Sequence, residues 1–179
     1  NRVGKTQAGS FEASHHLTGD YPHWWPGVRF DEPTECWAAG KSNETTRDIV
    51  QRSLLGDVVE LGSRKGVNGH GMIPCSAIDQ GSITWKAGVS NLVDTIRIRH
   101  ETGRWSKLGF KSYAQGRGGF EGTAQHFIWL DEEPPRDVYE ECLLRVTTTG
   151  GRLAITFTPL EGLSEVVMQF LPQEHRVGD

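Results

Sequence analysis

The stretch that most constrains the fold is a run of four apolar residues, 127–130, followed directly by Asp131 and Glu132. A strand that is apolar at every position is buried on both faces, as in a parallel sheet covered by helices. A second buried strand is predicted over residues 152–157. A helix is predicted between the two strands, opened by a proline pair and closed by a glycine pair. Strands alternating with helices predict an α/β fold with a parallel sheet.

The start of the chain has the pattern of a phosphate-binding loop. Gly4, Lys5 and Thr6 match the last three positions of the motif G-x-x-x-x-G-K-[ST]. Residues 7–17 predict a helix that stops at Gly19, and a helix there would aim its free N–H groups and its dipole at the phosphates. The first glycine of the loop and the strand that feeds it would lie before the first residue. We therefore expect the chain to be a piece of a longer protein.

Each residue of the loop has a chemical task. Gly4 allows close approach of the backbone to phosphate, Lys5 places a positive charge on the β- and γ-phosphates, and the Thr6 hydroxyl is a ligand for Mg²⁺. Arg2 and Val3 also lie within the loop, and Arg2 is a candidate contact of the γ-phosphate. The alternative for Arg2 is a simple surface arginine.

The two carboxylates after the apolar strand complete the pattern of an ATP site. Ligands of open α/β sheets bind at the carboxyl ends of the strands. Asp131 is placed to hold Mg²⁺, and Glu132 to orient and polarise an attacking water. The next strand ends near Thr158, which would bring a hydroxyl close to the γ-phosphate. The alternative for the two acids is a polar strand end that begins a loop, and for Thr158 it is a plain strand end followed by a turn-forming proline.

The remaining chain contains further predicted elements. They are a strand over residues 35–39, a helix capped by Thr45 or Thr46 and ended by Gly56, a mobile loop over residues 61–71, and a hairpin of strands 93–99 and 105–113.

Charge and composition limit the classes of function. With a net charge of -4 and a pI of about 6.0, the chain is not a basic domain that coats nucleic acid. We find no apolar run near the roughly 18 residues that a membrane span needs. The three cysteines are isolated, which favours reduced thiols and does not indicate a zinc site.

Basic residues nevertheless gather around the predicted hairpin, with only Glu101 opposing them in the sequence. They are either the solvated face of the hairpin or a surface that contacts a phosphate backbone. Arg117, in a glycine-rich loop, is a further candidate for an arginine finger acting on a neighbouring subunit. The six basic residues are Arg97, Arg99, Arg104, Lys107, Lys111 and Arg117.

Together these motifs resemble the terminase large subunits of tailed bacteriophages and prophages, along nearly the whole chain. Residues 1–6 resemble the family's variant phosphate loop, which carries an arginine in its middle. Residues 129–135 are the most specific match, and residues 157–159 are similar to the family's coupling motif. Residues 17–27 and 45–56 resemble one branch of the family.

The resemblance implies a partial P-loop ATPase domain over residues 1–179, of the ASCE type. It implies a mostly parallel sheet flanked by helices, with a β-hairpin insertion and without the first core strand. Carried over by position, Lys5 and Thr6 bind the phosphates and Mg²⁺, Asp131 binds Mg²⁺, Glu132 is the catalytic carboxylate and Thr158 is a coupling residue. The family's nuclease domain has no counterpart in this sequence, so DNA cutting is not assigned to it.

The resemblance also implies a function and a set of partners. The function is that of an ATP-powered motor that moves double-stranded DNA into a preformed capsid. The implied partners are the portal protein, the small terminase subunit and further copies of the chain in a ring, in the host cytoplasm and without a membrane. Two alternatives stay open: another P-loop ATPase such as a helicase, and a non-catalytic assembly module with a degenerate loop.

Overall fold

The computed structural model describes residues 4–158 and 164–170. Its strands are β1 (Glu35–Gly40), β2 (Val58–Leu61), β3 (Arg64–Val67), β4 (Ile78–Trp85), β5 (Val93–Arg99), β6 (Trp105–Ser112), β7 (Phe127–Asp131) and β8 (Arg152–Thr156). Its α-helices are α1 (Lys5–Thr18), α2 (Asn43–Thr45), α3 (Arg52–Leu55), α4 (Arg136–Thr147) and α5 (Glu165–Phe170). A π-helical turn, Thr46–Gln51, joins α2 to α3, and short 3₁₀ helices lie at Cys75–Ala77, Tyr113–Gln115 and Arg117–Phe120.

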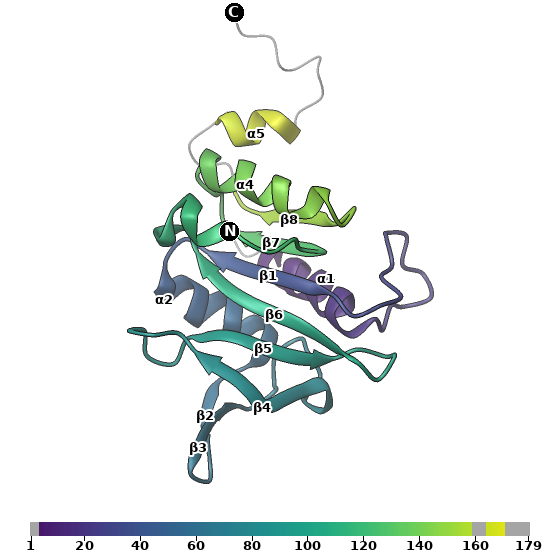
Figure 1. The fold of residues 1–179 in the computed structure, drawn as a ribbon, viewed down its shortest axis with the longest axis vertical. Helices are drawn as coiled ribbons and strands as arrows, with labels where there is room; N and C mark the ends of the chain where they lie inside the picture. The colour runs from purple at the N-terminus through teal and green to yellow at the C-terminus, as the bar shows by residue number, and fades with distance from the viewer. Residues whose placement is uncertain (1–3, 159–163, 171–179) are drawn as a thin grey trace, which may run out of the picture.

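Six strands form one mixed sheet in the order β4-β5-β6-β1-β7-β8, and β2 pairs with β3 in a separate hairpin (Figure 1). The pairs β6–β1, β1–β7 and β7–β8 are parallel, whereas β4–β5 and β5–β6 are antiparallel. The expected α/β fold and the parallel neighbours of the 127–130 strand are therefore confirmed. The predicted hairpin of β5 and β6 is also confirmed, and it extends the main sheet.

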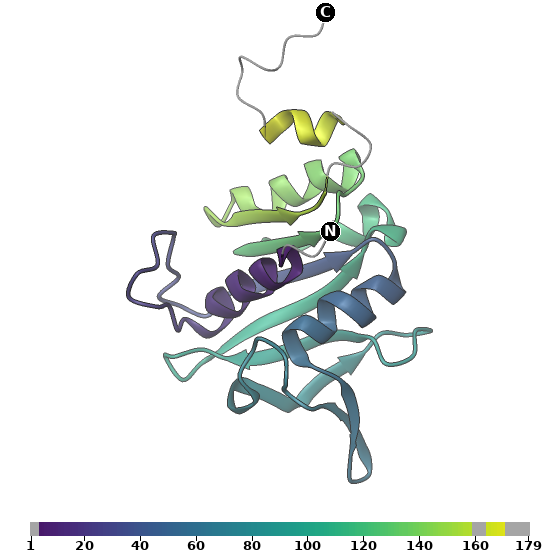
Figure 2. The same ribbon diagram turned by 180° about the vertical axis from the view of Figure 1, so that it is seen from behind.

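Strand β7 is buried on both faces, as its sequence predicts. All five of its residues are buried, and alternate side chains enter two different cores. Phe127 and Trp129 pack into the core beneath α1 and α3, while Ile128 and Leu130 pack into the core beneath α4. Figures 1 and 2 show α1 and α4 on opposite faces of the sheet. This two-sided cover accounts for the uninterrupted apolar run.

Helix α1 packs closely against β7 because it carries a glycine at the contact. A Cβ atom on Gly9 would lie 2.2 Å from Nε1 of Trp129, and Trp129 is fully buried. The helix ends where Gly19 adopts a left-handed conformation (φ 74°) and donates its N–H to the carbonyl of His15. The stop predicted at Gly19 is confirmed.

Three predictions about local structure are wrong. Residues 61–71 are not simply a loop, because Leu61 ends β2 and a two-residue turn through Gly62 (φ 65°) leads into β3. The helix after β1 is capped by the Ser42 side chain, which accepts from the Thr45 amide, so neither Thr45 nor Thr46 is its N-cap. Strand β8 is only half-buried, because β7 is its one neighbour in the described sheet.

The topology brings three chain segments to one edge of the sheet. The carboxyl ends of β7 and β8 lie side by side, with Asp131 paired to Thr156 in register. The start of α1 lies at the same edge, since Thr6 bonds to Asp131. In the described part of the chain, no helix combines the length and the apolar character needed to cross a membrane.

Candidate functional site

The first component of the site is the amino end of α1. Gly4 precedes the helix with φ 75°, a left-handed conformation that favours glycine. The first turn of a helix leaves N–H groups without intrahelical partners, which makes it a binding place for anions. Lys5 and Thr6 open this turn and are half-buried. Arg2 and Val3, which are also predicted loop residues, lie outside the described residues.

The second component is Asp131 at the end of β7, a carboxylate with 5% of its surface exposed. Its Oδ1 accepts a hydrogen bond from Oγ1 of Thr6 at 3.3 Å and a second from Oγ1 of Thr156 at 2.7 Å. Thr6 and Asp131 are 125 positions apart in the sequence. The fold thus joins the two motifs that the sequence alone could only relate by analogy.

Burial shifts the acidity of this carboxyl group. Desolvation is the largest cause and raises the pKa of Asp131 above its ordinary value, and the neighbouring charge of Glu132 acts in the same direction. The hydrogen bonds from Thr156 and Thr6 and the charge of Lys5 oppose this rise. Since the hydrogen bonds and the Lys5 charge do not fully offset the cost of burying this carboxylate, a bound cation would stabilise its charged form.

The third component is a contact between Lys5 and Thr158. Nζ of Lys5 donates to Oγ1 of Thr158 at 2.6 Å, across 153 positions of sequence. Thr158 follows β8, so the contact joins the start of α1 to the strand beside β7. The prediction that this hydroxyl lies close to the γ-phosphate stays a prediction, and the structure adds a contact of Thr158 with Lys5.

Glu132 stands in an unusual backbone conformation. Its φ is 67°, one of two positive values among the described residues other than glycine. Such a conformation costs about 1–3 kcal/mol and persists where surrounding contacts hold it. Its N–H donates to the carbonyl of Thr156 at 2.9 Å, and its side chain is exposed at the carboxyl edge of the sheet.

Three residues around the site were not predicted from the sequence. The hydroxyl of Tyr113 donates to the carbonyl oxygens of Asp131 and Glu132, at 3.0 and 2.9 Å. Trp129 Nε1 donates to Oγ1 of Thr156 at 2.8 Å, which orders the hydroxyl that holds Asp131. Neither a tyrosine after a strand nor a threonine at a strand end belongs to a sequence motif. Their roles therefore become visible only in the tertiary structure.

The candidate arginine finger has a partner within its own chain. Nε of Arg117 lies 3.0 Å from Oε2 of Glu141, whose side chain is 2% exposed, and Arg145 lies 2.9 Å from the other oxygen. This arrangement ties the 3₁₀ helix of Arg117 to α4. The arginine finger stays a prediction.

The basic residues around the β5–β6 hairpin are opposed by more acids than the sequence suggests. Arg97 pairs with Asp79 at 2.6 Å, and Arg104 pairs with Glu32. Both acids come from segments outside the hairpin, so the expectation of Glu101 as the sole opposing acid is wrong. Arg99 and Lys107 are exposed and no ion pair of theirs is found among the described residues.

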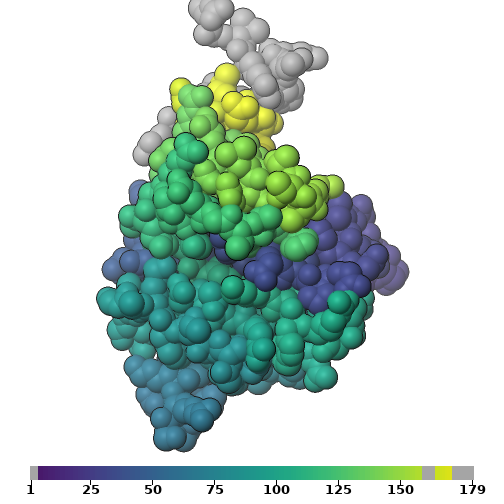
Figure 3. All heavy atoms as spheres, in the orientation of Figure 1, coloured from purple at the N-terminus to yellow at the C-terminus, as the bar shows by residue number. Residues whose placement is uncertain are grey.

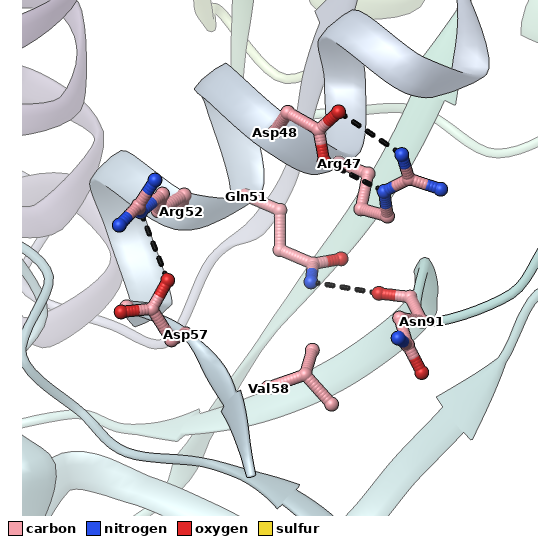
Figure 4. Close-up of a pocket in the computed structure, with 8 residues that line it drawn as sticks. Arg47, Asp48, Gln51, Arg52, Asp57, Val58 and Asn91 are labelled. Atoms are coloured by element: carbon pink, nitrogen blue, oxygen red, sulfur yellow. Dashed lines mark hydrogen bonds and ion pairs between the residues drawn. The ribbon is translucent and has the colours of Figure 1, made fainter.

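A separate hollow beside the π-helical turn is lined by charges that neutralise one another (Figure 4). Arg52 pairs with Asp57 at 2.9 Å, and the buried Gln51 donates to the carbonyl of Asn91 at 3.0 Å. None of its lining residues belongs to the edge that carries Asp131. Its contacts are those of a structural junction between the helix and the loop before β5.

Comparisons with known proteins give a consistent result. A family model described as "Terminase large subunit, T4likevirus-type, N-terminal" matches residues 1–177. The chain is 38% identical over 190 residues to the large terminase subunit of Salmonella phage P22, which covers 96% of this chain and 36% of that protein. The chain thus spans about a third of the length of this curated relative. No solved structure gives a significant match.

Proposed function

Because this chain belongs to the terminase large-subunit family, we propose that it is the ATP-hydrolysing motor domain of a DNA-packaging terminase. Membership of the family supports a part in phage DNA packaging, and the ATPase activity is inferred from the site. In this proposal the chain carries a P-loop NTPase core of the ASCE type. Hydrolysis at the carboxyl edge of the sheet drives double-stranded DNA into a capsid.

The observation that carries the proposal is the convergence of two distant segments on one edge. Lys5 bonds to Thr158, and Thr6 bonds to Asp131. A lysine and a hydroxyl at the start of a helix, facing an aspartate at the end of a parallel strand, are the parts that hold nucleotide phosphates and their metal. No other edge of the described sheet carries this combination.

The residues present fit a magnesium ion. Oγ1 of Thr6 and Oδ1 of Asp131 lie 3.3 Å apart, and both are oxygen ligands of the kind that Mg²⁺ prefers. No group of three or more His, Cys, Asp or Glu side chains suited to a metal occurs among the described residues. Two protein ligands are consistent with Mg²⁺, because this ion usually keeps several waters and binds phosphate oxygens. When bound, it neutralises charge that develops on the phosphates.

Lys5 and Glu132 have different roles in the proposed hydrolysis. Lys5 binds the β- and γ-phosphates and stabilises the charge that develops on the transferred group. Glu132, exposed beside Asp131, orients the attacking water and accepts its proton. Arg2 and Val3 complete the phosphate-binding loop in this proposal, and Arg2 touches the γ-phosphate.

Thr158 links the nucleotide to the rest of the sheet. A γ-phosphate competes with Thr158 for the Lys5 ammonium, so the 2.6 Å contact breaks or lengthens when nucleotide binds. Release of phosphate lets the contact form again. Lys5 therefore alternates between Thr158 and the γ-phosphate during the cycle, which is a local switch of the type that couples hydrolysis to movement.

DNA contacts are proposed for the open face of β5 and β6. Figure 1 shows no helix over this face, and Figure 3 shows its atoms at the molecular surface. The side chains of Arg99, Trp105 and Lys107 are exposed there. Lysine and arginine on an exposed face bind the phosphate backbone without reading sequence.

Further partners follow from the packaging function. The portal protein, the small terminase subunit and other copies of the chain, arranged in a ring in the host cytoplasm, are proposed as its partners. An arginine supplied by a neighbouring copy would act on the site, and Arg117 stays a candidate for it.

A packaging assay tests the proposed function. The full-length protein that contains this sequence is mixed with capsids bearing the portal, linear DNA, ATP and Mg²⁺, and DNA protected from nuclease is measured. We expect protection with the wild type and none with Lys5→Ala. Thr158→Val should retain ATP hydrolysis but lose protection, because it removes the partner that Lys5 exchanges.

Other outcomes would favour other functions. Unwinding of duplex DNA without capsid-dependent protection would favour a helicase. Absence of nucleotide binding in the full-length protein would favour a non-catalytic assembly module and would contradict the proposal.

A further inference from the structure

Tyr113 is a buried residue that the proposed reaction does not yet use. It stands directly after β6, in a 3₁₀ helix, and only 6% of its surface is exposed. Its ring packs in the core beneath α4, near Phe120. Its hydroxyl reaches the main chain at the end of β7, 18 and 19 positions away.

The hydroxyl makes two contacts with consecutive peptide groups. It lies 3.0 Å from the carbonyl oxygen of Asp131 and 2.9 Å from that of Glu132. The peptide between these residues is where the chain leaves the sheet, because the pairing of β7 with β1 ends at Leu130. Tyr113 therefore provides a hydrogen-bond donor for two carbonyl groups that lie beyond the last residue of β7 paired with β1.

This peptide needs a holding contact because Glu132 has a left-handed φ of 67°. Two contacts define its conformation: the Glu132 N–H donates to Thr156 on one side, and its carbonyl accepts from Tyr113 on the other. Loss of either contact frees the residue to relax toward an ordinary conformation. Relaxation would turn the carboxylate of Glu132 away from its place beside Asp131.

The hydroxyl is suited to remain a donor. Both partners are carbonyl oxygens, which only accept hydrogen bonds, so the hydroxyl is the donor in each contact. One proton serves two carbonyl oxygens, which makes the contact a shared hydrogen bond.

We propose that Tyr113 is a positioning residue: its hydroxyl holds the carbonyls of Asp131 and Glu132 so that the Glu132 carboxylate faces the phosphate end of the site. This inference rests on the proposed ATPase function. Tyr113 contacts main-chain carbonyls, and its effect on the reaction comes through the position of the Glu132 carboxylate. Misplacement of a reacting group by about 1 Å can lower a rate on the order of a hundredfold.

The test compares Tyr113→Phe with the wild type in the full-length protein that contains this sequence. The change removes the hydroxyl and keeps the ring. We expect kcat for Mg²⁺-dependent ATP hydrolysis to fall by at least about tenfold, with KM within about twofold, because phosphate binding by Lys5 and Thr6 is untouched. In the nucleotide-free protein, amide hydrogen exchange in residues 131–133 should accelerate.

Tyr139→Phe is the matched control. Tyr139 lies on α4, is also largely buried, and no hydrogen bond of its hydroxyl is found in the described structure. It should leave kcat and the exchange of residues 131–133 unchanged. Combining Tyr113→Phe with Glu132→Gln should add no loss beyond that of Glu132→Gln, because both changes act on one carboxylate.

The outcomes separate this inference from the proposed function. Unchanged exchange in residues 131–133 with Tyr113→Phe would overturn the inference, and so would equal losses of kcat in the Tyr113 and Tyr139 variants. Absence of ATP hydrolysis by the wild type would remove the proposed function. Accelerated exchange in Tyr113→Phe alone would still show that its hydroxyl holds the peptide.

Discussion

At the residue scale, the site depends on hydroxyl groups that fix a buried carboxylate. Trp129 donates to Thr156, Thr156 donates to Asp131, and Thr6 donates to the same oxygen. Each hydroxyl therefore has a defined direction in the structure. In the proposed function, a preorganised set of this kind needs little rearrangement to bind a metal and phosphates.

Asp131 gives a prediction about the pH dependence of stability. Its pKa is raised in the folded chain, chiefly by burial, so between its ordinary pKa and the raised one the folded chain holds a proton that the unfolded chain has released. Stability falls as pH rises through that window. Without Mg²⁺, Asp131→Asn should therefore raise the free energy of unfolding at pH 7, with a difference that shrinks toward acid pH.

Urea denaturation of both proteins across the pH range measures this difference. Asp137→Asn, a change of an exposed carboxylate in the first turn of α4, is the control and should show little effect. A variant Asp131→Asn that is less stable than the wild type at pH 7 would contradict the prediction.

The parts of the site that the sequence predicts are those with a linear motif. Gly4, Lys5, Thr6, Asp131 and Glu132 stand in two short segments whose spacing indicates their chemistry. The contacts that position them come from elsewhere in the chain. A Tyr113 hydroxyl that meets the end of β7 depends on the path of the chain after β6, which no local pattern specifies.

At the element scale, burial on both faces made β7 predictable from the sequence. Partly exposed strands were harder to predict. The β2–β3 hairpin is short and rich in charge, so it lacks the alternation that marks a strand. Strand β4 lies at the edge of the sheet and alternates only weakly, and it was not predicted. In β8, an apolar sequence predicted full burial, but a single neighbouring strand leaves it half-buried.

Helix α1 offers a test of close packing against β7. Gly9→Ala would improve helix propensity by about 1 kcal/mol in an exposed helix. Here the added Cβ would lie 2.2 Å from the Trp129 indole, which is fully buried and cannot move freely. We expect overpacking to dominate and the free energy of unfolding to fall by about 1–3 kcal/mol.

Gly118→Ala is the control for this change. Gly118 has no atom within 4 Å of its added Cβ, so the variant should be neutral or slightly more stable. Equal stability of Gly9→Ala and the wild type in urea denaturation would show that the helix can shift away from β7.

The ion pair of Arg117 gives a prediction about α4. Arg117→Met leaves the buried Glu141 with Arg145 as its remaining cation, so the free energy of unfolding should fall by about 1–2 kcal/mol. Arg99→Met changes an exposed arginine for which no ion pair is found among the described residues, and it should have little effect. A neutral Arg117→Met would mean that Arg145 alone compensates the carboxylate.

At the scale of the whole molecule, the site and the open sheet face belong to one sheet. Strand β6 carries Lys107 on the open face and leads directly into Tyr113, whose hydroxyl meets the site. The residues proposed to contact DNA and the residue proposed to hold the Glu132 carboxylate are thus joined by a single strand. Parallel pairing of β6 with β1 keeps this strand within the core sheet.

The open face predicts a salt-dependent affinity for duplex DNA. Replacing Arg99 and Lys107 by Gln should reduce the slope of log affinity against log salt by about one for each phosphate contact removed. The matched control replaces Arg64 and Lys65 on the β2–β3 hairpin by Gln, because these two basic residues are also exposed. Fluorescence anisotropy with a duplex over about 50–200 mM salt measures both slopes. Equal slopes for the two double variants would contradict this placement of the DNA.

The most direct measurement is Mg²⁺-dependent ATP hydrolysis by the full-length protein, with nucleotide binding measured on the same samples. The wild type should bind and hydrolyse ATP, and Lys5→Ala should lose binding. Glu132→Gln should bind ATP as the wild type does and lose hydrolysis by on the order of a hundredfold or more. Hydrolysis by Glu132→Gln at the wild-type rate would contradict the assignment of the catalytic carboxylate and the account of the site built on it.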